Sequence, residues 1–116
     1  MKPAFLAAVA LLSFSSGTAL ADVAEQEAIQ AQVAGAMASA DYAKAHCPNL
    51  TIDKERLDSQ VKRSGMTADQ LRASEDYADQ RQVIESIAST DKAVMLCVLL
   101  PKAHGGYGRG ILVGKD

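Results

Sequence analysis

The sequence predicts a small all-α domain of three to four helices with one disulfide. Apolar residues recur at helical spacing through the middle of the chain, where proline is rare. Two sequences typical of helix N-termini follow one another in that region, one at Asp53 and one at Thr67. The chain also has two cysteines, Cys47 and Cys97, which lie far apart in the sequence. These three observations favour helices that pack on one another and are joined by a cross-link.

The first 21 residues have the anatomy of a secretory signal peptide. Lys2 provides a positive start, Ala4–Leu12 is apolar, and Ala19–Ala21 matches the Ala-x-Ala cleavage pattern. The apolar stretch is well short of the roughly 20 residues that a membrane-spanning helix needs. We therefore expect cleavage after Ala21, export to the bacterial periplasm and no stable membrane anchor afterwards. Residues 22–116 then form a single domain.

A long helix is predicted at Asp22–His46. The segment is rich in good helix formers and has no proline. Ile29, Val33 and Met37 fall four residues apart and form one apolar stripe. Pro48 ends the helix, because the residue before a proline is driven out of helical conformation.

A shorter helix is predicted at Lys54–Ser64, after a connector at Asn49–Ile52. Asp53 has the character of an N-cap, and Gly65 is a typical C-terminal residue of a helix.

A second long helix is predicted from about Ala68 to Ala88. Thr67 and Gln70 have the spacing of a capping box, which is a strong sign of a helix start. Ser74 and Arg81 interrupt the apolar side of the segment. Such a stripe is typical of an amphipathic helix that lies on a core.

The unbroken apolar run Ala93–Leu100 is ambiguous, and we expect it to be buried. The favoured interpretation is a helix, with Thr90 as its cap and Pro101 just after its end. The alternative is a C-terminal β-hairpin of 93–100 with 111–113, joined through the start of the Gly-rich tail 105–116. Either way, we expect residues 111–113 to fold back onto the core.

Cys47 and Cys97 most simply form one structural disulfide, because the chain is predicted to be exported. In the chain-entropy model, closing a loop of about 50 residues stabilises the fold by roughly 4 kcal/mol. A redox-active pair would have the Cys-x-x-Cys spacing, which these two residues lack.

His46 and His104, together with Cys47 and Cys97, are candidate ligands for zinc or copper. Their spacing matches no metal-binding motif, and a disulfide would remove both thiolates. We therefore predict no metal or other cofactor, and keep metal binding through His46, His104 and the cysteines as the alternative function.

Other candidate chemistry is weaker. Glu75, Asp76 and Asp79 are expected on a solvated helix face near Arg72 and Arg81. The glycine-rich segment 106–110 lacks the flanking strand and helix of a phosphate loop. No nucleophile–base motif is present, so no enzymatic activity is predicted. A formal net charge of −2 argues against a nucleic-acid or anionic-membrane partner.

In architecture the predicted domain is similar to the small periplasmic acid-stress chaperones of the HdeA type, which are also short and helical and carry one disulfide. We find no shared sequence motif and assign the chain to no family. The expected function is that of an exported periplasmic protein that acts through contacts with an unknown protein partner, as an envelope-stress factor, chaperone or inhibitor.

Overall fold

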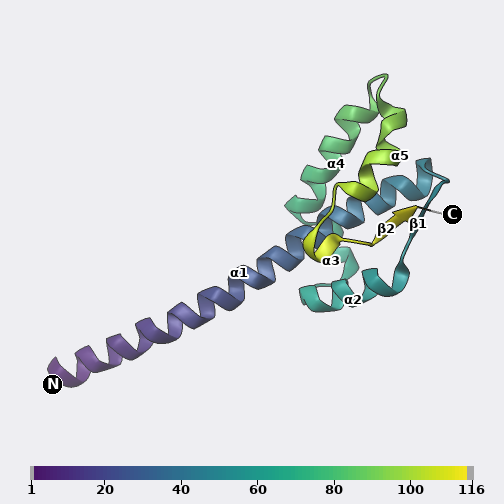
Figure 1. The fold of residues 1–116 in the computed structure, drawn as a ribbon. Helices are drawn as coiled ribbons and strands as arrows, with labels where there is room; N and C mark the ends of the chain where they lie inside the picture. Colours follow the sequence, from purple (N-terminus) through teal and green to yellow (C-terminus); the bar gives the residue numbers. More distant parts are fainter. Residues whose placement is uncertain (1, 115–116) are drawn as a thin grey trace.

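One helix, α1 (Lys2–His46), organises the fold, and the other elements pack around its C-terminal half (Figure 1). The computed structural model describes residues 2–114, and the side chains of residues 22–114. The part of α1 surrounded by the other elements is buried on nearly every side, including the stretch from Ala36 to Ala40. Small side chains allow this, because they let neighbouring backbones approach closely. The predicted helix Asp22–His46 is the C-terminal part of α1, which begins at Lys2, and it ends before Pro48 as expected.

The remaining elements follow in short succession. They are β1 (Leu50–Ile52), α2 (Lys54–Ser64), α3 (Ala68–Arg72), α4 (Glu75–Ala88), η1 (Ala93–Met95), α5 (Leu96–Leu99), η2 (Leu100–Lys102), η3 (Gly106–Gly108) and β2 (Leu112–Gly114). Within the described residues no helix combines the length and the apolar character needed to cross a membrane.

Local sequence signals account for the ends of α2 and the start of α3. The Asp53 carboxylate accepts a hydrogen bond of 3.1 Å from the backbone N–H of Arg56, as an N-cap does. Gly65 ends α2 with a φ of 74°, a left-handed conformation that favours glycine. Thr67 and Gln70 form the predicted capping box, each side chain bonding the backbone of the other. These predictions are confirmed.

The single helix predicted from Ala68 to Ala88 is wrong, because the chain breaks into α3 and α4. Ser74 stands at the break with extended backbone, and its hydroxyl accepts from the N–H of Tyr77. Glu75 and Asp76 then occupy the first turn of α4, where negative charge favours a helix start. The predicted small helical domain with one disulfide is confirmed, and its described residues form five α-helices, two of them very short, where three to four were predicted.

The C-terminal hairpin considered for 93–100 and 111–113 is also wrong. Residues 93–100 are helical, as the favoured interpretation predicted, and β2 pairs antiparallel with β1 instead. The register places Leu50 opposite Gly114, Thr51 opposite Val113 and Ile52 opposite Leu112. The segment expected to be a connector is thus a strand. Ile111 and Leu112 are buried, so this end of the chain does fold back onto the core.

The core has two parts. The disulfide cluster contains Ala43, Cys47, Ile84, Leu96, Leu100 and Leu112. The Leu71 cluster contains Ile29, Val33, Ala34, Met37 and Leu71. Both are built on α1, the first near its C-terminal end and the second nearer its middle.

Two predicted segments extend beyond the described side chains. The signal segment 1–21 lies outside them, so cleavage after Ala21 stays a prediction. The Gly-rich tail 105–116 contains the η3 turn and β2, and its last two residues lie outside the description.

Candidate functional surface

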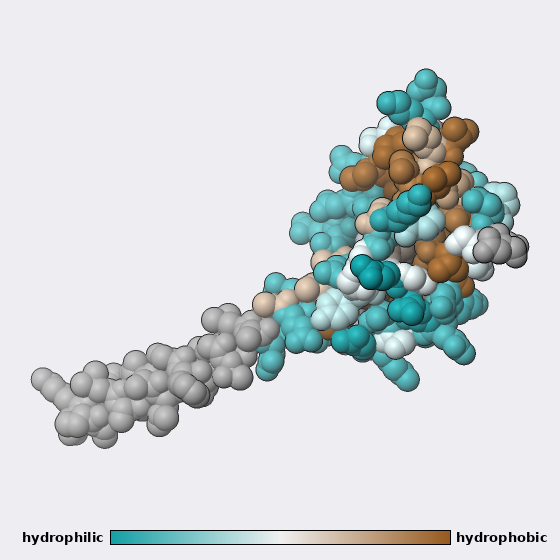
Figure 2. Space-filling model, in the orientation of Figure 1, coloured by the Kyte–Doolittle hydropathy of each residue, from teal (hydrophilic) through white to brown (hydrophobic). Residues whose placement is uncertain are grey.

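Four large apolar side chains of the η1–α5 segment face solvent, and together they form what we call the apolar patch. Val94 is 80% exposed and Val98 is 58% exposed, while Met95 and Leu99 are also exposed. Figure 2 shows apolar residues gathered on this part of the surface, around α5. A surface of adjacent apolar side chains is a common mark of a contact site for another molecule.

The expectation that the whole run Ala93–Leu100 is buried is therefore wrong. The segment is a short helical stretch, so side chains four residues apart share a face. Leu96 and Leu100 point into the disulfide cluster and are buried. Because every residue of the run is apolar, the faces that cannot reach the core are apolar too.

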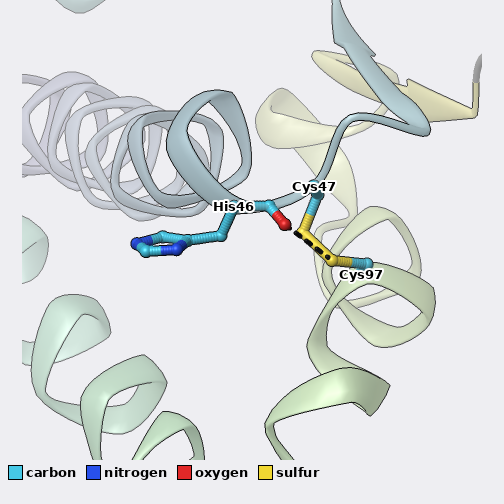
Figure 3. The surroundings of a disulfide bond; sticks show 3 residues. All are labelled: His46, Cys47 and Cys97. Atoms are coloured by element: carbon cyan, nitrogen blue, oxygen red, sulfur yellow. Dashed lines mark hydrogen bonds between the residues drawn. A yellow bond between two sulfur atoms is a disulfide. The ribbon is translucent and has the colours of Figure 1, made fainter.

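The predicted disulfide between Cys47 and Cys97 is confirmed, and it holds the patch in place. The two Cα atoms are 5.4 Å apart, and 50 residues separate the cysteines in sequence. Cys47 is buried at the end of α1, and the disulfide joins it to Cys97 of α5 (Figure 3). In sequence, Cys97 lies between the exposed patch residues Met95 and Val98. Its Sγ is 3.7 Å from the carbonyl oxygen of His46, a contact without a donated proton because a disulfide sulfur carries no hydrogen. The patch is thus covalently joined to the central helix.

The two predicted histidine candidates occupy different environments. His46 is exposed and stacks on Tyr42, with ring centroids 4.4 Å apart. His104 is half-buried, and its Nε2 lies 2.6 Å from the hydroxyl of Ser39. Ser39 also accepts a hydrogen bond of 3.1 Å from Gln80. Burial lowers the pKa of His104, because desolvation disfavours the charged ring.

The structure does not bring these candidates together as a ligand set. Ser39, which His104 contacts, precedes His46 by seven residues, or about 10 Å along the axis of α1. Both cysteine sulfurs are in the disulfide. Among the described residues no three His, Cys, Asp or Glu side chains are grouped so that they could hold a metal ion. Metal binding through His46, His104 and the cysteines, the alternative to the predicted absence of a metal, stays untested.

Sequence reasoning missed the polar contacts around His104. Ser39 is completely buried, and it joins α1 to α4 through Gln80 and to the C-terminal segment through His104. A shallow hollow of about 380 Å³ lies beside His104 and Gln80. The only sign in the sequence is a serine in an otherwise alanine-rich face, which is too common to identify a contact.

A second missed cluster joins α1 to α3 and α4. Asp41 accepts two hydrogen bonds from Arg72, of 2.9 and 3.1 Å, and one of 2.6 Å from the hydroxyl of Tyr77. Burial acts to raise the pKa of Asp41, but the hydrogen bonds and the charge of Arg72 outweigh it, so the pKa is lowered.

The acidic cluster predicted on a solvated face is exposed, as expected for Glu75, Asp76 and Asp79. The neighbouring arginines interact elsewhere, since Arg72 pairs with Asp41 and Arg81 pairs with Glu85.

No protein-family model matches this chain, and neither a curated protein nor a solved structure shows detectable similarity to it. Inferences about function therefore depend on the surface and contacts described above.

Proposed function

We propose that this chain is an exported periplasmic protein that acts through contacts with other polypeptides, and that the apolar patch is its contact surface. The observation that carries the proposal is the exposure of Val94, Met95, Val98 and Leu99 on a segment fixed to α1 by a disulfide. Exposed apolar side chains gain free energy when a partner covers them, by about 25 cal/mol per Å² of apolar surface buried. Of the three roles considered, envelope-stress factor, chaperone and inhibitor, a surface of this kind best supports holding unfolded chains.

Export is supported by the signal-like first 21 residues and by the disulfide, which persists in oxidising compartments. The intact mass of protein purified from the periplasm without reductant tests this part. We expect the mass of residues 22–116 less two hydrogen atoms, as one disulfide requires. A protein that retains its first residues, or carries reduced cysteines, contradicts it.

The contact function is tested by the aggregation of denatured citrate synthase after dilution into buffer without reductant, followed by light scattering. We expect the protein to suppress scattering at near-stoichiometric amounts. A variant with Val94→Ser and Val98→Ser should lose most of the suppression, because both substitutions remove apolar surface from the patch. The absence of reductant matters, because it keeps the disulfide intact.

Val23→Ser is the control for loss of an exposed apolar side chain outside the patch. Val23 is 50% exposed, but it lies on α1, 24 residues before Cys47 in the sequence. This variant should suppress scattering as the unchanged protein does. The proposal is overturned if the patch variant stays as active as the control, or if the unchanged protein has no effect on scattering. Circular dichroism on all three proteins confirms that the fold is retained.

A further inference from the structure

A second surface feature lies beside Cys47, between the C-terminal end of α1 and strand β1. The patch residues, in contrast, lie on the segment that contains Cys97. This second feature is a hollow of about 480 Å³. Its apolar lining comes mainly from Ala43, Cys47, Pro48, Leu50, Ile52 and Leu112. Two exposed lysines, Lys44 and Lys54, line it as well. A hollow that combines apolar side chains with a few charged groups has the composition of a binding site.

On the side away from β2, the N–H of Leu50 donates a hydrogen bond of 3.0 Å to the carbonyl of Cys47, and among the described residues no strand pairs with β1 on that side. Asp53 donates a hydrogen bond of 2.8 Å to the carbonyl of Ile111, directly opposite it in the register. In an antiparallel pair, bonded and non-bonded positions alternate. Thr51 therefore bonds to β2, while the N–H and the carbonyl of Ile52 point away from it. An open strand edge is a template for a further strand.

The charged side chains that line the hollow are both positive. The nearest acidic side chain in the sequence, Asp53, already accepts the N–H of Arg56 as the cap of α2. Glu55 and Arg56 line a separate hollow on α2. Lys44 and Lys54 are thus the charged residues of this site.

We propose that β1 binds an extended segment of a partner polypeptide, which adds to the sheet as a third strand. The segment places an apolar side chain in the hollow and acidic side chains beside Lys44 and Lys54. Main-chain hydrogen bonds to Ile52 give affinity, and the hollow and the lysines give specificity, as in other strand-addition complexes. A second copy of this chain fits less well, because its β1 would bring the same lysines with it. The inference shares with the proposed function only the class of partner, a polypeptide.

The test uses short capped peptides titrated into the isotopically labelled, disulfide-bonded protein and followed by amide NMR. The first probe is acetyl-Glu-Val-Leu-Val-Glu-amide, and the second has both glutamates replaced by lysines. We expect the acidic peptide to bind at least tenfold more tightly and to shift the amides of Thr51, Ile52 and Leu112. Two N-methylated forms of it, one at both valines and one at the leucine, test the main-chain bonds. One of the two should lose binding, because alternate N–H groups of an added strand face β1.

A Lys44→Glu, Lys54→Glu variant should reverse the preference between the two peptides. The control variant, Lys62→Glu with Lys102→Glu, makes the same charge change at exposed lysines that do not line the hollow. It should keep the original preference. Amide spectra of the free variants verify that each is folded.

The proposal is overturned if both peptides bind equally, if both N-methylated forms bind like the parent, or if only amides of the apolar patch shift. Concentration-dependent shifts of β1 without peptide would show self-association and also overturn it. Failure here is distinct from failure of the proposed function. Val94→Ser with Val98→Ser removes suppression of aggregation but leaves peptide binding intact, whereas reversal of Lys44 and Lys54 alters peptide binding.

Discussion

The elements around the Leu71 cluster and those around the disulfide cluster are connected to one another in different ways. Around the Leu71 cluster, polar side chains join one element to the next: Gln26 and Gln30 both donate to the carbonyl of Ser64, and Arg72 binds Asp41. Around the disulfide cluster, the segments η1, α5 and η2 have no side-chain caps. There the links to α1 are the burial of Leu96 and Leu100 beside Ala43 and the covalent bond between the two cysteines.

This difference explains why the apolar patch is on the disulfide side. A helix of one turn forms few internal hydrogen bonds and is not stable by itself. Only Leu96 and Leu100 anchor the segment in the core through burial of large side chains. The cross-link replaces the further buried side chains that would otherwise be needed, and so allows Val94 and Val98 to remain exposed.

Removal of the disulfide should lower the free energy of unfolding more than any other change proposed below. In Cys47→Ala with Cys97→Ala, the free energy of unfolding should fall by about 4 kcal/mol, because the unfolded chain regains the freedom of a 50-residue loop. Urea denaturation followed by circular dichroism measures the loss. Hydrogen exchange should rise first in residues 93–102, while α2 and α3 stay protected.

Uniform loss of protection in both parts of the core would contradict the comparison. It would show that the disulfide cluster and the Leu71 cluster unfold as one unit. The unchanged protein after reduction is a second test, since it breaks the same bond without leaving a smaller side chain at the buried position of Cys47.

A smaller effect is expected on the other side of the molecule. Asp41→Asn removes the negative charge that Arg72 and Tyr77 bind, and it should cost about 1 kcal/mol, because the pair is partly exposed and screened. The pKa of Asp41 is lowered in the fold, so its contribution is present above the ordinary value of 3.8 and is lost as the pH falls through the folded pKa. Chemical denaturation between pH 7 and pH 2 measures the loss of stability in the variant and the dependence of stability on pH.

Asp79→Asn is the control, because Asp79 is exposed on α4 and its substitution removes the same negative charge. It should leave stability at neutral pH nearly unchanged. If the two variants behave alike, Asp41 has no special role in joining α1 to α3 and α4.

The features that the sequence predicted are those with short-range signals. The cap at Asp53, the terminator at Gly65 and the capping box at Thr67 depend on neighbouring residues alone. The disulfide was predictable for another reason, because two cysteines allow only one intramolecular pairing. The helix break was missed although Ser74 has cap character, since it was interpreted as an interruption of the apolar stripe.

The features that the sequence did not predict depend on distant pairings. β1 is three residues long, and its strand character comes from its pairing with β2 some 60 positions later. The contact of Ser39 with His104 is likewise a tertiary one, between residues 65 positions apart. Exposure of the patch follows from how little of the η1–α5 segment reaches the core. The hollow beside β1 has the same kind of origin, because no local pattern encodes it.

The smallest expected effect concerns His104, which joins the C-terminal segment to α1 near the boundary of the two clusters. The side chains around it, Ser39, Gln80 and Gln32, are uncharged, so burial alone lowers its pKa. Above the ordinary value of 6.5, the ring is neutral in both the folded and the unfolded chain. As the pH falls below 6.5, the unfolded chain binds a proton first, and the free energy of unfolding decreases until the folded ring is protonated as well. The slope is at most about 1.4 kcal/mol per pH unit, because one proton is involved.

His104→Gln should remove this slope, since glutamine cannot titrate. His46→Gln serves as the matched control, because it removes the other imidazole at an exposed position and should retain the slope. Urea denaturation at half-unit intervals from pH 8 to pH 5 measures it. A slope that persists in His104→Gln would assign the titration to another group, and His104 would then contribute to stability only through its contact with Ser39.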